Sequence, residues 1–422
     1  MHVIVLGCGL AGVTTAYFLR EQGAAVTVLD RASGPARETS FANGSLLTPS
    51  LADPWNSPGV FGVLLRSLGR EDAPMLLRPK ALPSLALWGL SFLRNSTQAR
   101  YESSFLNNVR ISSYSQTVLA TLLQKHPLQF EHAMDGTLQV FRKQKGLEHG
   151  LKVAHFLKQV EIRHRALTRE ELIEFEPALA PIKGDLSGGI AYPDDEVGNA
   201  RLFCEALCDV AKNSGVIFRF GEQVLRVERR RKMVTGVITA RESLEADAYV
   251  LATGSYSPEF AKQLGFRLPV RPAKGYSLTL PMIEAGPRPR HAVIDDEIHA
   301  AVVPLGESLR IAGTAEFTGY DQRINPRRIA NLLALLRRIY PEFRIDEQRM
   351  KSWTGLRPMT TDGMPILGTS PLANLFLNTG HGPLGWTMAC GSGKIVADMV
   401  LNQRSEFEAR AYRYDRFRWG RK

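Results

Sequence analysis

The chain has 422 residues, of which 44% are hydrophobic and 23% charged, and its formal net charge at pH 7 is +11. This length predicts two domains, and the composition is that of a folded soluble protein. The positive charge favours anionic partners, but no zinc-finger, RRM or helix-turn-helix pattern accompanies it, so we expect no nucleic-acid binding.

The four cysteines, Cys8, Cys204, Cys208 and Cys390, are too few for a disulfide framework and suit a reducing compartment. Cys204 and Cys208 lie one helical turn apart with no histidine nearby, which favours core packing over metal ligation. The chain opens directly with a strand-like run and has no stretch of 18 apolar residues, so we expect neither a signal peptide nor a membrane-spanning helix. These features predict a cytoplasmic protein without a metal site.

Residues 2–31 carry the most specific pattern of the chain. An apolar run of strand length, His2–Leu6, leads into a glycine-rich turn. A helix is expected over 11–20, and a second β-branched run follows at Ala25–Leu29. This order of elements predicts a βαβ unit.

The turn has G-x-G-x-x-G spacing, formed by Gly7, Gly9 and Gly12. Gly7 permits the tight turn, Gly9 lets the backbone approach a pyrophosphate, and Gly12 lets the helix pack closely on the strand. The anion then meets the helix N-terminus, and Asp30 stands where a carboxylate accepts from a ribose hydroxyl. We therefore predict that this unit binds a dinucleotide.

Two unusual stretches come next. Residues 32–58 are polar and turn-rich, and Ser40, Asn43 and Gly44 offer a hydroxyl, an amide and bare backbone to a ligand. Residues 59–94 mix leucine and tryptophan with arginine, and prolines break them into short pieces. Two interpretations of 59–94 stay open: an interfacial patch with basic flanks, or short helices packed in a second domain.

The remaining elements follow from hydrophobic periodicity and capping residues. Four basic residues at 229–232 fall between two strand-like runs and predict a solvated hairpin turn. We expect helices over 105–125, 143–158, 169–175, 201–214 and 326–340. Strands are expected over 137–141, 188–192, 216–220, 223–227, 234–240, 248–251, 274–280, 300–304 and 309–313.

Near the C-terminus a strand at 375–378, a glycine loop at 379–386 and a helix at 387–401 repeat the order of the first unit. We therefore predict an α/β fold, in which a Rossmann-like cofactor domain is assembled from separated segments. A substrate domain with a mainly antiparallel sheet and helices is inserted between them. The predicted cofactor domain takes residues 1–58, 194–268 and 350–422, and the substrate domain takes 59–193 and 269–349.

Several long motifs resemble the D-amino-acid oxidase superfamily of FAD-dependent amine oxidoreductases, and within it the bacterial D-amino-acid dehydrogenases of the small-subunit type. The resemblance runs nearly end to end. It rests on VIVLGCGLAGVTTAYFL at the start, ETSFANGSLLTPS, the leucine-rich segment 59–94, KGYSLTLP, GTAEFTGYD, WTGLRPMTTDGMPILG and NTGHGPLGWTMACGSG.

The resemblance implies FAD as the cofactor. It implies noncovalent binding, because Met359, Thr360 and Thr361 stand where related sarcosine oxidases carry a tethering cysteine. The cofactor site that it implies draws on residues from several segments, namely Gly7, Gly9, Gly12, Asp30, Arg31, Ser40, Asn43, Val224, Ala252, Gly254, Gly382, Leu384, Gly385 and Trp386.

The implied reaction removes two electrons from the Cα–N bond of an amino acid, most simply as hydride from Cα to flavin N5, and water then releases the 2-oxo acid and ammonia. Arg357, in the GLRP motif, is the candidate that grips the substrate carboxylate with two parallel hydrogen bonds. Tyr276 is expected to donate to the same carboxylate or to line the pocket, and His381 to polarise the ring. Their alternatives are a structural ion pair, strand packing and a structural hydrogen bond. No general base is required if the amine arrives neutral.

The resemblance favours a D-alanine-like substrate. The resemblance, the positive charge and residues 59–94 together favour a quinone as the acceptor of its electrons. The protein would then sit peripherally on the cytoplasmic face of the inner membrane. The alternatives are an oxygen-using oxidase, or a dehydrogenase for glycine, sarcosine, D-proline or hydroxyproline. A non-catalytic flavin-binding sensor is a remote third.

Overall fold

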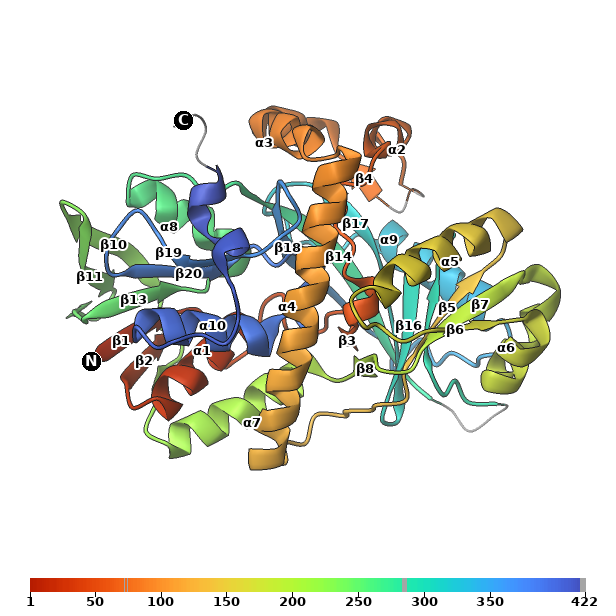
Figure 1. Cartoon of the computed structure of the whole chain (residues 1–422), viewed down its shortest axis with the longest axis horizontal. Coiled ribbons are helices and arrows are strands. Elements are labelled where there is room, and N and C mark those ends of the chain that lie inside the picture. Colours follow the sequence, from red (N-terminus) through yellow and green to blue (C-terminus); the bar gives the residue numbers. More distant parts are fainter. Residues whose placement is uncertain (72, 74, 283–286, 418–422) are drawn as a thin grey trace.

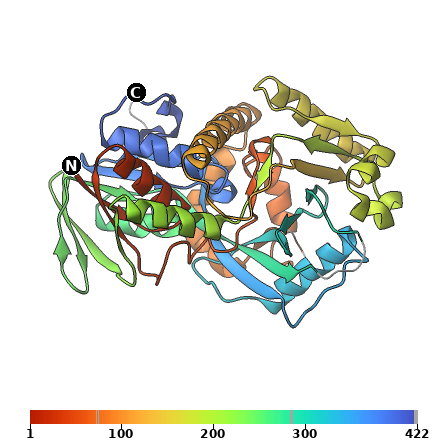
Figure 2. The same cartoon turned by 90° about the horizontal axis from the view of Figure 1, so that it is seen from below.

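The computed structural model describes residues 1–417 apart from 72, 74 and 283–286, and their strands form two large sheets that lie side by side along the long axis (Figure 1). The long helix α4 (Gln98–Lys125) crosses the molecule between the two halves, as both Figure 1 and Figure 2 show. Each half contains segments that are far apart in the sequence.

The first sheet has the strand order β19-β20-β13-β1-β2-β9, and its neighbours are parallel except for β19 and β20. Residues 3–6 of its central strand are buried, as expected when both faces of a parallel sheet are covered. The strands are β1 (His2–Leu6), β2 (Ala25–Leu29), β9 (Ile217–Arg219), β13 (Ala248–Leu251), β19 (Ile366–Thr369) and β20 (Leu375–Thr379).

Helices cover one face of this sheet, and a small sheet with one helix covers the other (Figure 1). The alternation of side chains along β1 sends Val3 and Val5 to the first face and Ile4 and Leu6 to the second. The first face packs against α1 (Leu10–Glu21), α7 (Ala200–Asn213) and α10 (Ala389–Val400). The second packs against α8 (Ser257–Gln263) and the sheet of β10 (Val224–Arg230), β11 (Met233–Thr239) and β12 (Ser243–Leu244).

These contacts confirm the predicted α/β fold with a Rossmann-like sheet built from separated segments. Helix α10 lies directly on α1, where a Cβ at Gly393 would stand only 2.5 Å from Thr14 Oγ1. The Thr14 hydroxyl also donates to the Ala389 carbonyl at 3.0 Å. The two strand–glycine–helix units, one from each end of the chain, are therefore packed against each other.

The second sheet is mainly antiparallel, with the order β18-β14-β17-β16-β15-β5-β7-β6, and β4 pairs with β17. Helix α9 (Pro326–Ile339) packs on one of its faces through Leu332 and Leu336. The strands are β4 (Met75–Leu77), β5 (Thr137–Phe141), β6 (Arg165–Leu167), β7 (Gly188–Tyr192), β14 (Val270–Pro281), β15 (Ala292–Asp295), β16 (Ala300–Leu305), β17 (Ser308–Phe317) and β18 (Lys351–Thr360). A separate pair joins β3 (Leu46–Leu47) to β8 (Glu196–Val197).

Some element boundaries differ from the prediction. Helix α4 begins at Gln98, seven residues before the expected start at 105, because Tyr101 and Ser104 continue the helix face that packs on the core. Strand β18 pairs with β14, so residues 351–360 lie in the second sheet, although the predicted cofactor range starts at 350. The domain ranges themselves stay a prediction.

The basic cluster 229–232 lies at the predicted hairpin, with its turn at 231–232 and its first two residues in β10. Helices α5 (Gln144–Lys158) and α6 (Arg169–Phe175) are found where the sequence predicts them. The Thr168 hydroxyl accepts from the Glu171 N–H, as a cap should.

Residues 59–94 form α2 (Val60–Arg66), β4 and α3 (Leu82–Arg94), and the two helices lie at the top of the view in Figure 1, near the middle of the long axis. One face of α3 is buried: Trp88 packs with Phe92 and Phe317, and its indole N–H donates to the carbonyls of Pro269 and Met359. The opposite face is apolar and exposed. The short packed helices of the second interpretation are therefore present, while contact of the exposed face with lipid stays a prediction.

Candidate active site

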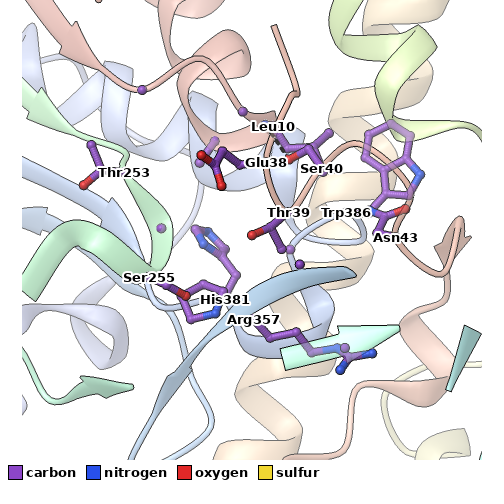
Figure 3. Close-up of a pocket in the computed structure, with 18 of the residues that line it drawn as sticks. Leu10, Glu38, Thr39, Ser40, Asn43, Thr253, Ser255, Arg357, His381 and Trp386 are labelled. Atoms are coloured by element: carbon purple, nitrogen blue, oxygen red, sulfur yellow. Dashed lines mark hydrogen bonds between the residues drawn. The ribbon is translucent and has the colours of Figure 1, made fainter. Parts of the chain in front are cut away.

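A cavity of about 520 Å³ runs between the two large sheets, from the glycine turn after β1 to strands β14, β17 and β18. Figure 3 shows part of its lining, including Ser40, Asn43, Arg357, His381 and Trp386. In the described part of the chain, the sequence-predicted site residues that do not line it are Gly12, which packs beneath the turn, and Leu384, which is buried beside it.

The glycine turn has the close approaches that the spacing predicts. Gly7 has φ +100°, and a Cβ there would stand 2.7 Å from the carbonyl oxygen of Ala252. A Cβ at Gly12 would stand 1.9 Å from the carbonyl oxygen of Gly7, so only glycine fits. Helix α1 begins after Gly9, which has no side chain to cap it. The Ser40 hydroxyl accepts from the Leu10 N–H at 3.2 Å, and the positive end of the helix dipole faces the cavity.

Asp30 lies at the same end of the cavity and holds the turn. Its carboxylate accepts from the N–H of Cys8 at 2.6 Å and of Ala32 at 2.8 Å. Burial raises the pKa of this carboxyl above its usual range. Each carboxylate oxygen has a second lone pair, so Asp30 can still accept from a ribose hydroxyl.

Arg31 closes the outer side of this end of the cavity. Its guanidinium pairs with Glu38 at 2.5 Å and lies 4.2 Å from the centre of the Tyr256 ring. Gln322, from the loop after β17, donates to both Glu38 and Tyr256. The two halves of the molecule therefore meet over the dinucleotide end of the cavity.

Arg357 lies at the opposite end of the cavity, on β18. Its Nη1 donates to the Thr314 carbonyl at 3.2 Å, and its guanidinium lies 5.7 Å from the centre of a Trp55 ring. Among the described residues Arg357 has no ion-pair partner, and burial lowers the pKa of its guanidinium to about 10. An arginine that is desolvated and still lacks an acid is ready to receive a carboxylate from a ligand.

The position of Arg357 depends on Gly275, which lies two residues along β14 from Ala273, the cross-strand partner of Arg357. A Cβ at Gly275 would stand 2.2 Å from Arg357 Nη1, so an alanine there must displace the guanidinium. We expect Gly275→Ala to raise KM for a carboxylate substrate and to leave the flavin content unchanged, because the turn that binds the dinucleotide is at the other end of the cavity. Steady-state kinetics with the absorbance spectrum tests this, and an unchanged KM would contradict it.

Tyr276 has a partner of its own. Its side chain shares a core cluster with Leu278 and Leu280, on the α9 side of β14, and its hydroxyl donates to Glu316 at 2.6 Å. Burial and this hydrogen bond raise the pKa of Tyr276 well above its usual range. The ring borders the cavity, but this geometry gives no support to the predicted hydrogen bond from the phenol to a substrate carboxylate.

His381 follows β20 and is only 6% exposed. Its Nε2 lies 3.0 Å from the Ser392 hydroxyl of α10, and burial lowers the pKa of the imidazole to about 4. His381 is therefore neutral at physiological pH. It borders the cavity as an uncharged polar group, next to Gly382 and Gly385.

The lowered pKa of His381 makes the free energy of unfolding depend on pH. Below about pH 6.5 the unfolded chain protonates this histidine and the folded chain does not. We therefore expect unfolding free energy to fall by about 2 kcal/mol between pH 7.5 and pH 5 from this group alone. Urea titrations of wild type and His381→Gln measure it, with the exposed His155→Gln as control. Equal pH slopes in wild type and His381→Gln would contradict the prediction.

Two residues at this end of the cavity were not singled out from the sequence. The Trp353 ring lies over Gly355, where a Cβ would stand 2.0 Å from it, and Arg310 contacts the loop that carries Asn43. One signal in the sequence pointed to Arg310: it is a charged residue within an apolar strand, between Leu309 and Ile311.

The residues present fit a flavin adenine dinucleotide. The glycine turn and the start of α1 suit its pyrophosphate, and Asp30 suits a ribose. Val224 and Ala252 border the same end, while Asn43, Gly382, Gly385 and Trp386 border the other end, beside Arg357.

Comparison with known proteins agrees with this assignment. The family model described as FAD dependent oxidoreductase matches residues 2–399. A D-amino acid dehydrogenase of Paramagnetospirillum magneticum is 41% identical over 418 residues, 99% of each chain, and one of Chromohalobacter salexigens is 40% identical over 405 residues, 96% of each chain.

Solved structures show the same fold at lower identity. The glycine oxidase of Geobacillus kaustophilus matches with a TM-score of 0.74 and 21% identity, over 97% of each chain. The L-proline dehydrogenase of P. horikoshii matches with a TM-score of 0.77 and 17% identity, over 99% of this chain and 97% of that one. From the cavity, the glycine turn and the full-length match together, the chain belongs to the FAD-dependent oxidoreductase family.

Proposed function

We propose that this flavoprotein oxidises D-amino acids, D-alanine among them, to 2-oxo acids and ammonia. The single observation that carries the proposal is the desolvated Arg357 guanidinium at the far end of the cofactor cavity, without an acid partner among the described residues. Relatives at about 40% identity over nearly the whole chain are named D-amino acid dehydrogenase, which supports the choice of substrate.

Bound FAD supplies the redox chemistry, as acceptor of two electrons from the substrate. The side chains of the protein bind and orient the substrate. Arg357 binds the substrate carboxylate, Gly275 leaves room for the guanidinium, and Trp55 covers it from the other side. His381 is neutral and adds no charge that would repel an incoming amine. No base is assigned, because a substrate that arrives as the neutral amine needs none.

An anaerobic titration tests the substrate class. Under argon, D-alanine is expected to bleach the yellow protein, and L-alanine is expected to leave it yellow. Glycine, sarcosine and D-proline complete the panel. Bleaching by glycine or sarcosine alone would replace the proposal with its amine-oxidase alternative, and no bleaching by any of them would favour a flavin-binding sensor.

We further propose that electrons pass to a quinone at a membrane surface. Six of the most exposed large apolar side chains gather on α2, α3 and the chain between them, among them Leu87, which is 75% exposed, and Leu90, which is 61% exposed. Exposed basic residues surround them. We call this set the apolar patch: Phe61, Leu65, Leu68, Leu82, Leu87 and Leu90, with Arg66, Arg70, Lys80 and Arg94 around it. Such a surface suits anionic lipid.

Beneath the apolar patch, the buried face of α3 packs toward the redox end of the cavity. The buried face of α3 belongs to one cluster with Trp55 and Met359, and the Met359 sulfur would lie 3.4 Å from a Cβ at Gly382. A lipid-soluble acceptor that enters at the patch would therefore meet apolar side chains as far as the cavity wall. None of the helices in the described part of the chain is long and apolar enough to cross a bilayer, so this contact would be peripheral.

Two measurements test the acceptor and the membrane contact separately. Reduced protein is expected to reoxidise faster with a ubiquinone analogue than with dissolved oxygen, and the reverse order would identify an oxidase. In flotation with anionic vesicles, Leu87→Glu with Leu90→Glu is expected to abolish binding. Ile217→Glu, at an equally exposed apolar site on β9, is expected to keep it. Wild type that does not float would exclude the membrane contact.

A further inference from the structure

Arg310, the third residue of β17, is a buried arginine that, like Arg357, has no acid partner among the described residues. It is 5% exposed, and none of the ion pairs formed by described residues includes it. Its hydrogen bonds go to uncharged groups: Nε donates to the Thr279 hydroxyl at 3.0 Å, and Nη1 donates to the Ser45 hydroxyl at 2.8 Å and the Asn43 carbonyl at 3.4 Å.

These bonds hold the loop 42–45 against the second sheet. Ser277 of β14 donates to the Ala42 carbonyl at 2.6 Å, beside the contacts of Arg310. On the other side of the loop, the Gly198 N–H donates to the Ser45 carbonyl. Ser45 itself is held at φ +59°, a conformation that L-residues adopt only when their surroundings impose it. The loop lines the cavity beside Trp386, at its redox end.

Charge is distributed unevenly along the cavity. All four carboxylates of its lining, Asp30, Glu38, Glu222 and Glu259, lie at the adenosine end or on its outer rim. The redox end has Arg357 in its wall, and Arg310 one layer behind the loop that forms it. Arg31 lies among these carboxylates and pairs with Glu38, so the net charge is positive only at the redox end of the cavity.

The surroundings do not neutralise Arg310. Burial lowers the pKa of its guanidinium to about 10, while the more distant Glu131 and Arg201 act in opposite directions. Glu131 is engaged by the side-chain amide of Asn199. A buried charge without a counter-charge is costly, and charged groups perturbed in this way are concentrated at functional sites.

We propose that Arg310 is a positioning residue with an electrostatic role: it fixes the loop 42–45 at the redox end of the cavity and raises the reduction potential of the bound flavin. Uptake of two electrons with one proton adds one negative charge to the redox group, and a fixed cation nearby stabilises that charge. Arg310 touches neither cofactor nor substrate in this scheme, and acts through the loop and through its field.

The test is the reduction potential of the bound flavin. It is measured against a reference dye while a second, added enzyme slowly reduces both the flavin and the dye, with no amino acid present. Arg310→Gln keeps hydrogen-bonding capacity toward Ser45 and removes the charge. It is expected to shift the two-electron equilibrium at least tenfold toward the oxidised form, which is about 30 mV. Lys351→Met is the matched control, since it removes an exposed positive charge on β18 opposite Thr279, and its potential is expected to stay at the wild-type value.

Arg310→Lys gives a second measurement if the glutamine variant loses its flavin. A buried lysine sheds its proton more readily than arginine. The reduction potential of the lysine variant is expected to equal that of wild type at pH 7 and to fall below it at pH 9, where the Arg310 guanidinium of wild type is still protonated. A glutamine variant within threefold of wild type, or a lysine variant with no pH-dependent gap, would overturn the proposal. Because no substrate is used, either result is independent of the D-amino-acid assignment.

Discussion

Replacing Arg357 by methionine is expected to lower kcat/KM for D-alanine by roughly two to four decades while the protein stays yellow. The buried guanidinium is the partner of the substrate carboxylate in the proposed function, and removal of one member of a buried ion pair costs about 3–5 kcal/mol. Methionine keeps most of the volume of the side chain, so the cavity wall stays packed.

The control for this variant is Lys351→Met, which removes an exposed positive charge from the same strand and is expected to keep full activity. Anaerobic reduction by D-alanine reports the chemical step, and the visible spectrum reports bound flavin. An Arg357→Met protein within threefold of wild type would refute the assignment of the carboxylate site.

Replacing Gly12 by alanine is expected to remove the cofactor. The new Cβ would stand 1.9 Å from the Gly7 carbonyl oxygen, and both partners of that clash are backbone, so the turn itself must open. Ordinary overpacking costs about 1–3 kcal/mol, or roughly 5- to 150-fold in affinity, and because this clash is between backbone atoms we expect the loss of affinity for FAD to exceed that range. The measurement is the dissociation constant of FAD from the apoprotein by flavin fluorescence.

Gly184→Ala is the matched control, since a Cβ at Gly184 meets no heavy atom within 4 Å and its affinity for FAD is expected to be unchanged. A Gly12→Ala protein that is purified with full flavin content would contradict the role of the turn. Release of all flavin on denaturation of the wild type would support noncovalent binding, which Met359, Thr360 and Thr361 predict.

The two variants separate two requirements of one site. Gly12→Ala is expected to give a colourless protein, and Arg357→Met a yellow protein that an amino acid does not bleach. The difference follows from the position of the residues at opposite ends of the cavity, one under the dinucleotide turn and the other on β18. A common defect in both variants would indicate loss of folding instead.

The elements that the sequence predicted correctly depend on local patterns. The run His2–Leu6, the glycine spacing after it and the position of Asp30 identify a βαβ unit, because each is set by neighbours within about 30 residues. Helix α6 with its Thr168 cap is found for the same reason. The start of α4 was missed because Tyr101 and Ser104 contact the core in a pattern that carries no clear apolar period.

Only the tertiary structure decided which distant strands pair and in which direction single side chains point. The pairing of β14 with β18 places Gly275 against the Arg357 guanidinium, and a bulge in the pairing of β14 with β17 accompanies the placement of Tyr276 beside Glu316. Arg310 can hold the loop 42–45 only because these residues fold onto β17. The sequence alone determined that the chain holds a dinucleotide, since that site is built largely from one continuous segment. The site at its redox end joins segments that are far apart in the chain, and no local rule sets the distances between them.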